Sequence, residues 1–150
     1  MAFFVINEWL WADSSGENGI DAQRQAFQII VRFSESDHQI IIIEGSPFDQ
    51  KTWALCKSTS TIVRRLVKAF LVNVRQNSDR CLLLKPESAA DLREELASSI
   101  KYDDRYLVRA QLSVSGAVLV TTDTPLREAV TRSGLPCLSR EEFLSQYSGL

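Results

Sequence analysis

The polar residues that end the apolar runs of this sequence are mostly acidic. In a parallel α/β sheet, ligands bind beyond the carboxyl ends of the strands, so chemistry is sought first among the polar residues at those ends. Carboxylates that converge there repel one another, and a hard cation with oxygen ligands, such as Mg²⁺ or Mn²⁺, relieves the repulsion. We therefore expect a divalent-metal site, with candidate residues that end or flank the apolar runs: Asn7, Glu8, Glu44, Asp103, Asp104 and Asp123.

Several of these residues also have an ordinary structural explanation. Asp104 suits the first turn of a helix, and Asp123 can cap the helix predicted to begin at Pro125. Glu44 can simply be solvated. Only convergence of the carboxylates in space separates the two explanations.

Apolar runs that alternate with helical patterns must position these residues. The segment 9–11 either extends the first strand or opens a loop. Strands that alternate with helices imply right-handed crossovers, so we predict a three-layer α/β/α fold with a central, mostly parallel sheet of four to five strands. The predicted strands are 3–6, 39–43, 81–84, 117–121 and 135–138, and the predicted helices are 20–36, 58–76, 87–99, 103–115, 125–133 and 139–147.

Length and composition set the protein class. The chain has 150 residues, of which 45% are hydrophobic and 24% charged, and we expect one globular domain over residues 1–150. No apolar run approaches the ~20 residues that span a bilayer, and the first residues lack the basic start of a signal peptide, so a cytoplasmic protein is expected. Three widely spaced cysteines indicate neither a disulfide framework nor a zinc ribbon.

The stretch 103–123 carries a more specific pattern. Asp103-Asp104 opens an amphipathic helix, a turn at Gly116 follows, and an apolar strand ends in Thr121-Thr122-Asp123. A short strand and a final helix then occupy residues 134–144. This pattern resembles the signature of PIN domains, and the order of elements resembles that family over the whole chain.

The resemblance implies a metal-dependent nuclease in which acidic residues bind Mg²⁺ or Mn²⁺ and activate water against a phosphodiester, most often in RNA. Asp104, with its neighbour Asp103, matches the family's acidic residue at the helix start, and Asp123 matches the Asp after the fourth strand. Glu44 is the nearest match to the second acidic residue, and Asp49 is the next.

The end of the first strand departs from the family pattern. Asn7-Glu8 stands where family members usually have Asp, and an amide oxygen is a poorer Mg²⁺ ligand than a carboxylate. Glu8 can substitute, but in a regular strand only one of the two residues faces the site. Two functions are therefore open: a ribonuclease acting on single-stranded RNA, with Asp104, Asp123, Glu44 and Asn7 in the catalytic site, or a catalytically impaired PIN-like module that binds protein or RNA.

Other classes and partners follow from the remaining residues. A phosphate-accepting receiver domain is disfavoured, because Asp123 lies late in the chain and the third strand ends in Lys85-Pro86. The resemblance also bears on partners. Small PIN proteins are frequently toxins, so the resemblance suggests an antitoxin partner. Together with the apolar residues of the predicted helices, Trp9, Trp11 and Trp53 exceed what a small core covers, so we expect some of them to form a homodimer contact. A basic stripe offers an RNA backbone contact or a solvated helix face; its members are Lys57, Arg64, Arg65, Lys68, Arg75 and Arg80.

Overall fold

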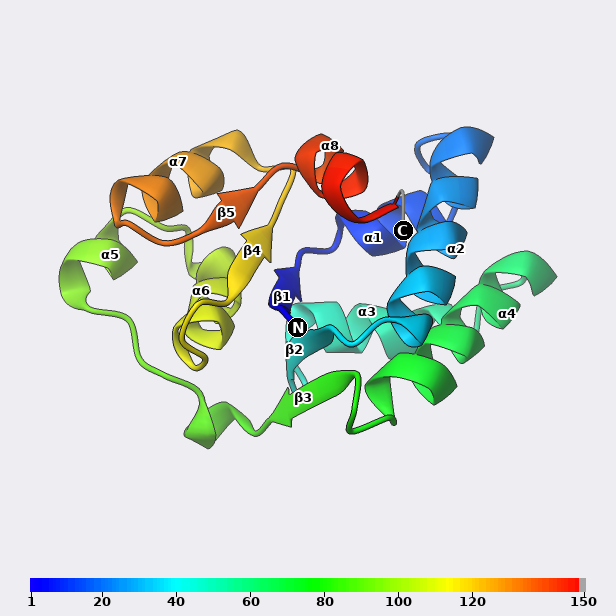
Figure 1. Ribbon diagram of the computed structural model, residues 1–150, viewed down its shortest axis with the longest axis horizontal. Helices are drawn as coiled ribbons and strands as arrows, with labels where there is room; N and C mark the ends of the chain where they lie inside the picture. Colours follow the sequence, from blue (N-terminus) through cyan, green and yellow to red (C-terminus); the bar gives the residue numbers. More distant parts are fainter. Residues whose placement is uncertain (149–150) are drawn as a thin grey trace.

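A computed structural model describes residues 1–148, and a five-stranded sheet runs through its centre (Figure 1). The strand order is β3-β2-β1-β4-β5, and every neighbouring pair is parallel. The predicted α/β class is confirmed. The strands are β1 (Phe3–Ile6), β2 (Gln39–Ile43), β3 (Cys81–Leu84), β4 (Val118–Val120) and β5 (Cys137–Leu138).

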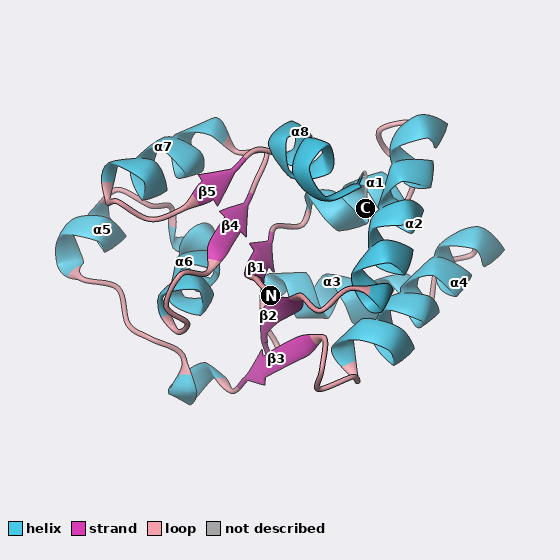
Figure 2. Cartoon of the chain, viewed as in Figure 1, coloured by secondary structure: helices cyan, strands magenta, loops and turns pink. Residues whose placement is uncertain are grey.

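Helices cover both faces of this sheet and complete the predicted three layers (Figure 2). The α-helices are α1 (Trp9–Ser14), α2 (Ile20–Glu35), α3 (Pro47–Leu55), α4 (Thr61–Phe70), α5 (Glu94–Ser98), α6 (Arg105–Leu112), α7 (Thr124–Arg132) and α8 (Arg140–Phe143). Short 3-10 or π segments are η1 (Leu71–Arg75), η2 (Pro86–Ser88), η3 (Tyr102–Asp104) and η4 (Leu144–Ser148). No helix among residues 1–148 is long and apolar enough to cross a bilayer.

Alternating side chains of the central strands divide the core in two. Phe4 and Ile40 point into one apolar cluster, which includes residues of α1, α2, α4 and α8. Val5 and Ile41 point into the other, which includes residues of α5, α6 and α7. Successive strand residues face opposite sides, so a strand that is buried on both faces must be apolar there, as residues 40–43 of β2 are.

The segment that follows β1 forms a helix rather than the strand extension or loop that the sequence suggested. In α1, Trp11 is fully buried and its ring lies 5.4 Å from that of Phe48 and 4.9 Å from that of Phe70. Trp9 is also buried, and its indole Nε1 donates a hydrogen bond to the Val120 carbonyl. These two rings belong to the core of one chain, so they no longer support the predicted dimer contact.

Two further helical boundaries differ from the prediction. Residues 47–55 form α3, which the sequence reading missed, although Ser46 caps it and Pro47 occupies its first turn. The helix predicted over 87–99 is limited to η2 and the short α5. The closing helix begins as predicted, with a capping box between Ser139 and Glu142.

A buried ion pair ties α3 to the end of η1. The Arg75 guanidinium donates to both carboxylate oxygens of Asp49, from Nε at 2.6 Å and from Nη2 at 2.9 Å. The Gly45 amide donates to the same carboxylate at 2.9 Å. This hydrogen bonding raises the pKa of Arg75. Arg75 therefore serves the fold and is not available to the basic stripe.

We predict that Asp49→Asn destabilises the protein by about 3 kcal/mol, because it leaves the buried guanidinium without a counter-charge. Urea unfolding measures the change. Asp21→Asn is the matched control, since Asp21 pairs with Arg24 at 3.8 Å on the surface, and its effect should stay within about 1 kcal/mol. Equal losses in both variants would contradict the structural role of the buried pair.

Candidate functional site

The structure brings Asp104 and Asp123 to one cavity. Asp104 ends η3 and Asp123 directly precedes α7, and both line a cavity of about 120 Å³. Burial raises the pKa of Asp104, and the negative charges of Asp123 and Asp103 raise it further, while Lys101 opposes them. Two carboxylates from separate elements therefore repel each other here, as expected for a cation site.

Asp123 is both a helix cap and a member of this pair. Its Oδ1 accepts the Leu126 amide hydrogen bond at 3.0 Å. Its Oδ2 receives no hydrogen bond from any residue within 1–148. Asp123 therefore caps α7, as the sequence suggested, and capping uses only one of its two carboxylate oxygens. The other oxygen is available to a ligand.

Asn7 bridges the ends of β1 and β4. Its Nδ2 donates to Thr121 Oγ1 at 3.0 Å, and its Oδ1 accepts the Glu8 amide at 2.7 Å. Thr121 Oγ1 also accepts the Asp123 amide at 3.1 Å. The Asn7 side chain is therefore engaged on both sides. It holds the two strand ends together and, through Thr121, fixes the start of the segment that carries Asp123.

The buried hydroxyl of Tyr106 experiences the negative charges of both Glu8 and Asp104. Burial raises the pKa of its hydroxyl strongly, and the charges of Glu8 and Asp104 raise it further. The hydroxyl oxygen is buried without a well-formed hydrogen bond among the described residues, although an interaction with the Phe48 backbone lowers its pKa. A buried polar atom without a partner costs free energy, so this hydroxyl is a group that a bound ligand or ordered water could satisfy.

The other predicted site residues lie further out. Asp103 is exposed, and it reaches the pair only through its charge on Asp104. Glu44 is exposed at the end of β2, where its charge acts on Arg75 rather than on Asp104. Its role as a metal ligand stays a prediction. Asp49, the next candidate, is occupied by Arg75.

The basic stripe is only partly available to a ligand. Arg64 donates to the Ser58 carbonyl and Arg80 to the Ser34 carbonyl, so both are used within the fold, as Arg75 is. Its three remaining members are exposed: Lys57, Arg65 and Lys68. Trp53 is partly exposed and lies over the Arg75 guanidinium at 5.2 Å, where a cation–π contact holds it.

Sequence reasoning did not find Lys101, Thr121 or Tyr106 as site residues. Lys101 lines the cavity with the two carboxylates, and its nearness to Asp103-Asp104 was the available signal. Thr121 was visible as the first residue of the Thr-Thr-Asp run. Tyr106 gave no signal, because its importance comes from a hydroxyl that packing buries without a well-formed hydrogen bond.

The residues present fit a hydrated divalent cation. Within residues 1–148, no group of three or more His, Cys, Asp and Glu side chains is placed to hold a metal. Mg²⁺ retains several waters and is often bound by one or two carboxylates together with substrate phosphates. Asp104 and Asp123 supply two such carboxylates. The raised pKa of Asp104 means that its negative charge is unfavourable in the folded protein, and a bound cation would offset that cost.

Comparison with known proteins adds no family assignment: no protein-family model matches the chain, and no curated protein matches it. The resemblance to PIN domains stays a prediction based on the sequence motifs.

We predict that Asp104→Asn raises the melting temperature at neutral pH. A carboxyl group whose pKa is raised by folding holds its proton more tightly in the folded state, so its stabilisation is complete at low pH and is lost as the pH rises through the folded pKa. At pH 7 the charged form therefore destabilises the native protein, and Asn removes that charge.

Calorimetry of Asp104→Asn and of the exposed control Asp79→Asn, at neutral pH and at a pH below the ordinary Asp range, measures this effect. The gain should be specific to Asp104→Asn and should shrink at low pH. A loss of stability at neutral pH would refute the repulsive pair.

Proposed function

We propose that this protein is a divalent-metal-dependent ribonuclease that hydrolyses phosphodiester bonds of single-stranded RNA. The observation that carries the proposal is the pair Asp104 and Asp123, which share a cavity beyond the end of β4. Perturbed acidic groups in a cavity are typical of functional sites, and this edge of a parallel sheet is where such sites form. The PIN-like motifs over 103–144 supply the reaction class.

The roles of the residues follow from charge and position. Asp104 and Asp123 would hold Mg²⁺ or Mn²⁺. When bound, the cation supplies a Lewis acid that activates water and neutralises charge on the phosphodiester. Lys101 lines the same cavity and provides a cationic side chain beside a substrate phosphate. Asn7 positions Asp123 through Thr121.

The hydrogen bonding of Asn7 favours an alternative function, binding without efficient catalysis. Its amide is committed to Thr121 and to the Glu8 backbone, and it carries no charge. A site with two carboxylates and no third one binds a cation more weakly than a fuller acidic set would. Under that alternative, the chain is a PIN-like module that binds RNA or protein without efficient cleavage. Both functions require RNA or a protein as partner, and neither requires an antitoxin or a second copy of the chain.

We predict that Mn²⁺ supports cleavage of single-stranded RNA by the wild type and that Asp123→Asn lowers the rate by about 100-fold or more, because a ligand charge is lost. Asn is as good a helix cap as Asp, so α7 should remain folded. Cleavage of a labelled oligoribonucleotide in Mn²⁺ and in EDTA measures the rates. Asp21→Asn, on the surface of α2, is the charge-matched control and should retain wild-type activity.

Asn7→Asp separates the two functions. The new carboxylate can accept a hydrogen bond from the Thr121 hydroxyl, and it returns a negative charge to the strand end. We expect metal affinity to increase about tenfold. Equal cleavage by wild type, Asp123→Asn and Asn7→Asp would place the activity elsewhere. Binding of RNA without cleavage by the wild type or by Asn7→Asp would favour the binding module.

A further inference from the structure

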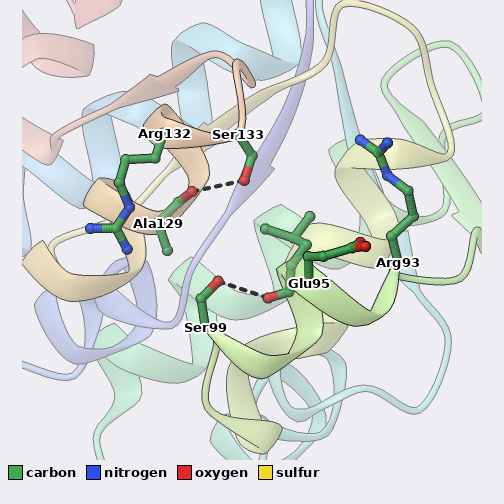
Figure 3. Close-up of a pocket in the computed structure, with 7 residues that line it drawn as sticks. Arg93, Glu95, Ser99, Ala129, Arg132 and Ser133 are labelled. Atoms are coloured by element: carbon green, nitrogen blue, oxygen red, sulfur yellow. Dashed lines mark hydrogen bonds between the residues drawn. The ribbon is translucent and has the colours of Figure 1, made fainter.

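A second pocket lies between α5 and α7 (Figure 3). Its volume is about 460 Å³, and Ser99 lines both this pocket and the cavity that holds Asp104 and Asp123. The pocket and the cavity therefore meet at Ser99 beside α7, and the two hollows together are called the groove between α5 and α7. Its lining residues are Arg93, Glu95, Leu96, Ser99, Ala129, Arg132 and Ser133.

The side-chain donors that this pocket offers to a ligand are two guanidinium groups. The Ser99 hydroxyl donates to the Leu96 carbonyl at 2.9 Å, and the Ser133 hydroxyl donates to the Ala129 carbonyl at 3.0 Å, so their protons are already used (Figure 3). The guanidinium groups of Arg93 and Arg132 make no hydrogen bond or ion pair among the described residues. Guanidinium groups in this state are suited to bind phosphate oxygens.

The placement of the two arginines favours an extended anion over a single phosphate. Arg93 precedes α5 and Arg132 ends α7, and Figure 3 shows them on opposite margins of the pocket. Along α7, Arg132 lies six positions after Leu126 of the carboxylate cavity, which corresponds to about 9 Å of helix. One phosphate cannot occupy both places, but successive phosphates of one strand can.

A neighbouring hollow of about 440 Å³ lacks this character, although Arg132 lines it too. Its second arginine, Arg127, already faces Glu142 at 3.7 Å. Burial raises the pKa of its Cys137 thiol to about 11, which leaves that thiol neutral. The groove between α5 and α7 is therefore the better path for a polyanion.

We propose that the groove between α5 and α7 holds the backbone of single-stranded RNA, with Arg132 and Arg93 binding phosphates that flank the one placed at Asp104 and Asp123. This inference rests on the proposed function for the position of the cleaved phosphate. Glu95 also lines the pocket and repels phosphate, so it opposes the two arginines. The proposal therefore predicts that loss of the Arg93 charge weakens RNA binding and that loss of the Glu95 charge strengthens it.

The test measures RNA binding in EDTA, where no cleavage occurs. A short fluorescein-labelled oligouridylate is titrated with the full chain at several salt concentrations, and fluorescence anisotropy gives Kd. Arg132→Gln and Arg93→Gln should each weaken binding about threefold, and each should reduce the slope of log Kd against log salt by about 0.7. Their combination should reduce it by about 1.4, and Glu95→Gln should tighten binding.

Arg24→Gln is the matched control, because Arg24 is exposed on α2, outside both the groove and the basic stripe. It should leave Kd and the slope unchanged. Arg65→Gln, on α4, tests the basic stripe as the competing RNA contact. The proposal is overturned if the wild type does not bind the oligouridylate, if both groove variants bind as the wild type does, or if Arg65→Gln has the larger effect.

The same variants distinguish this inference from the proposed function. Binding that depends on Arg93 and Arg132, without cleavage in Mn²⁺, would support the groove and refute the ribonuclease. If the wild type cleaves RNA in Mn²⁺ but the Arg93 and Arg132 variants bind RNA with the wild-type Kd, the ribonuclease would be supported and the groove refuted.

Discussion

The reversal of strand order at β1 is the constraint on which the rest of the structure depends. From β1 the sheet grows through β2 and β3 on one side and through β4 and β5 on the other, so no connection covers the adjoining ends of β1 and β4. Backbone groups at that opening need partners, and Asn7 and Thr121 supply them. Asp123 follows β4 directly at this opening, and η3, which precedes α6, places Asp104 in the same cavity as Asp123.

The fold treats its buried and half-buried carboxylates in two ways. Asp49 faces Arg75, and Asp13 faces Arg140 at 2.7 Å, so the two most deeply buried acids are each neutralised by an arginine. Asp104 and Asp123 have no such ion pair within residues 1–148 and instead raise each other's free energy when charged. The two buried acids are thus paired with arginines, whereas the two carboxylates at the strand ends repel each other. This contrast is the physical basis of the metal proposal.

Much of the fold was predictable from the sequence, because its signals are local. The β-branched run of β2, the period of α2 and the Pro-started α7 all lie where the sequence pattern placed them. The segment Trp9–Ser14 was not predictable in this way, since its helix is stabilised by burial of two tryptophans and has no side-chain cap. The approach of Asp104 to Asp123 was anticipated from their motif. The buried Tyr106 hydroxyl and the arginine-lined groove were not anticipated, because they arise from packing of α5, α6 and α7.

The pairing of β1 with β4 has a consequence for synthesis of the protein. β1, β2 and β3 can associate once the first 84 residues have left the ribosome, which leaves one edge of β1 open. That edge stays unpaired until Val118–Val120 emerges, and an exposed apolar edge invites association with other chains. Asp104 and Asp123 also lie in the last third of the sequence. A nascent chain therefore lacks the carboxylate pair until Asp123 has emerged, directly after the strand that covers the open edge of β1.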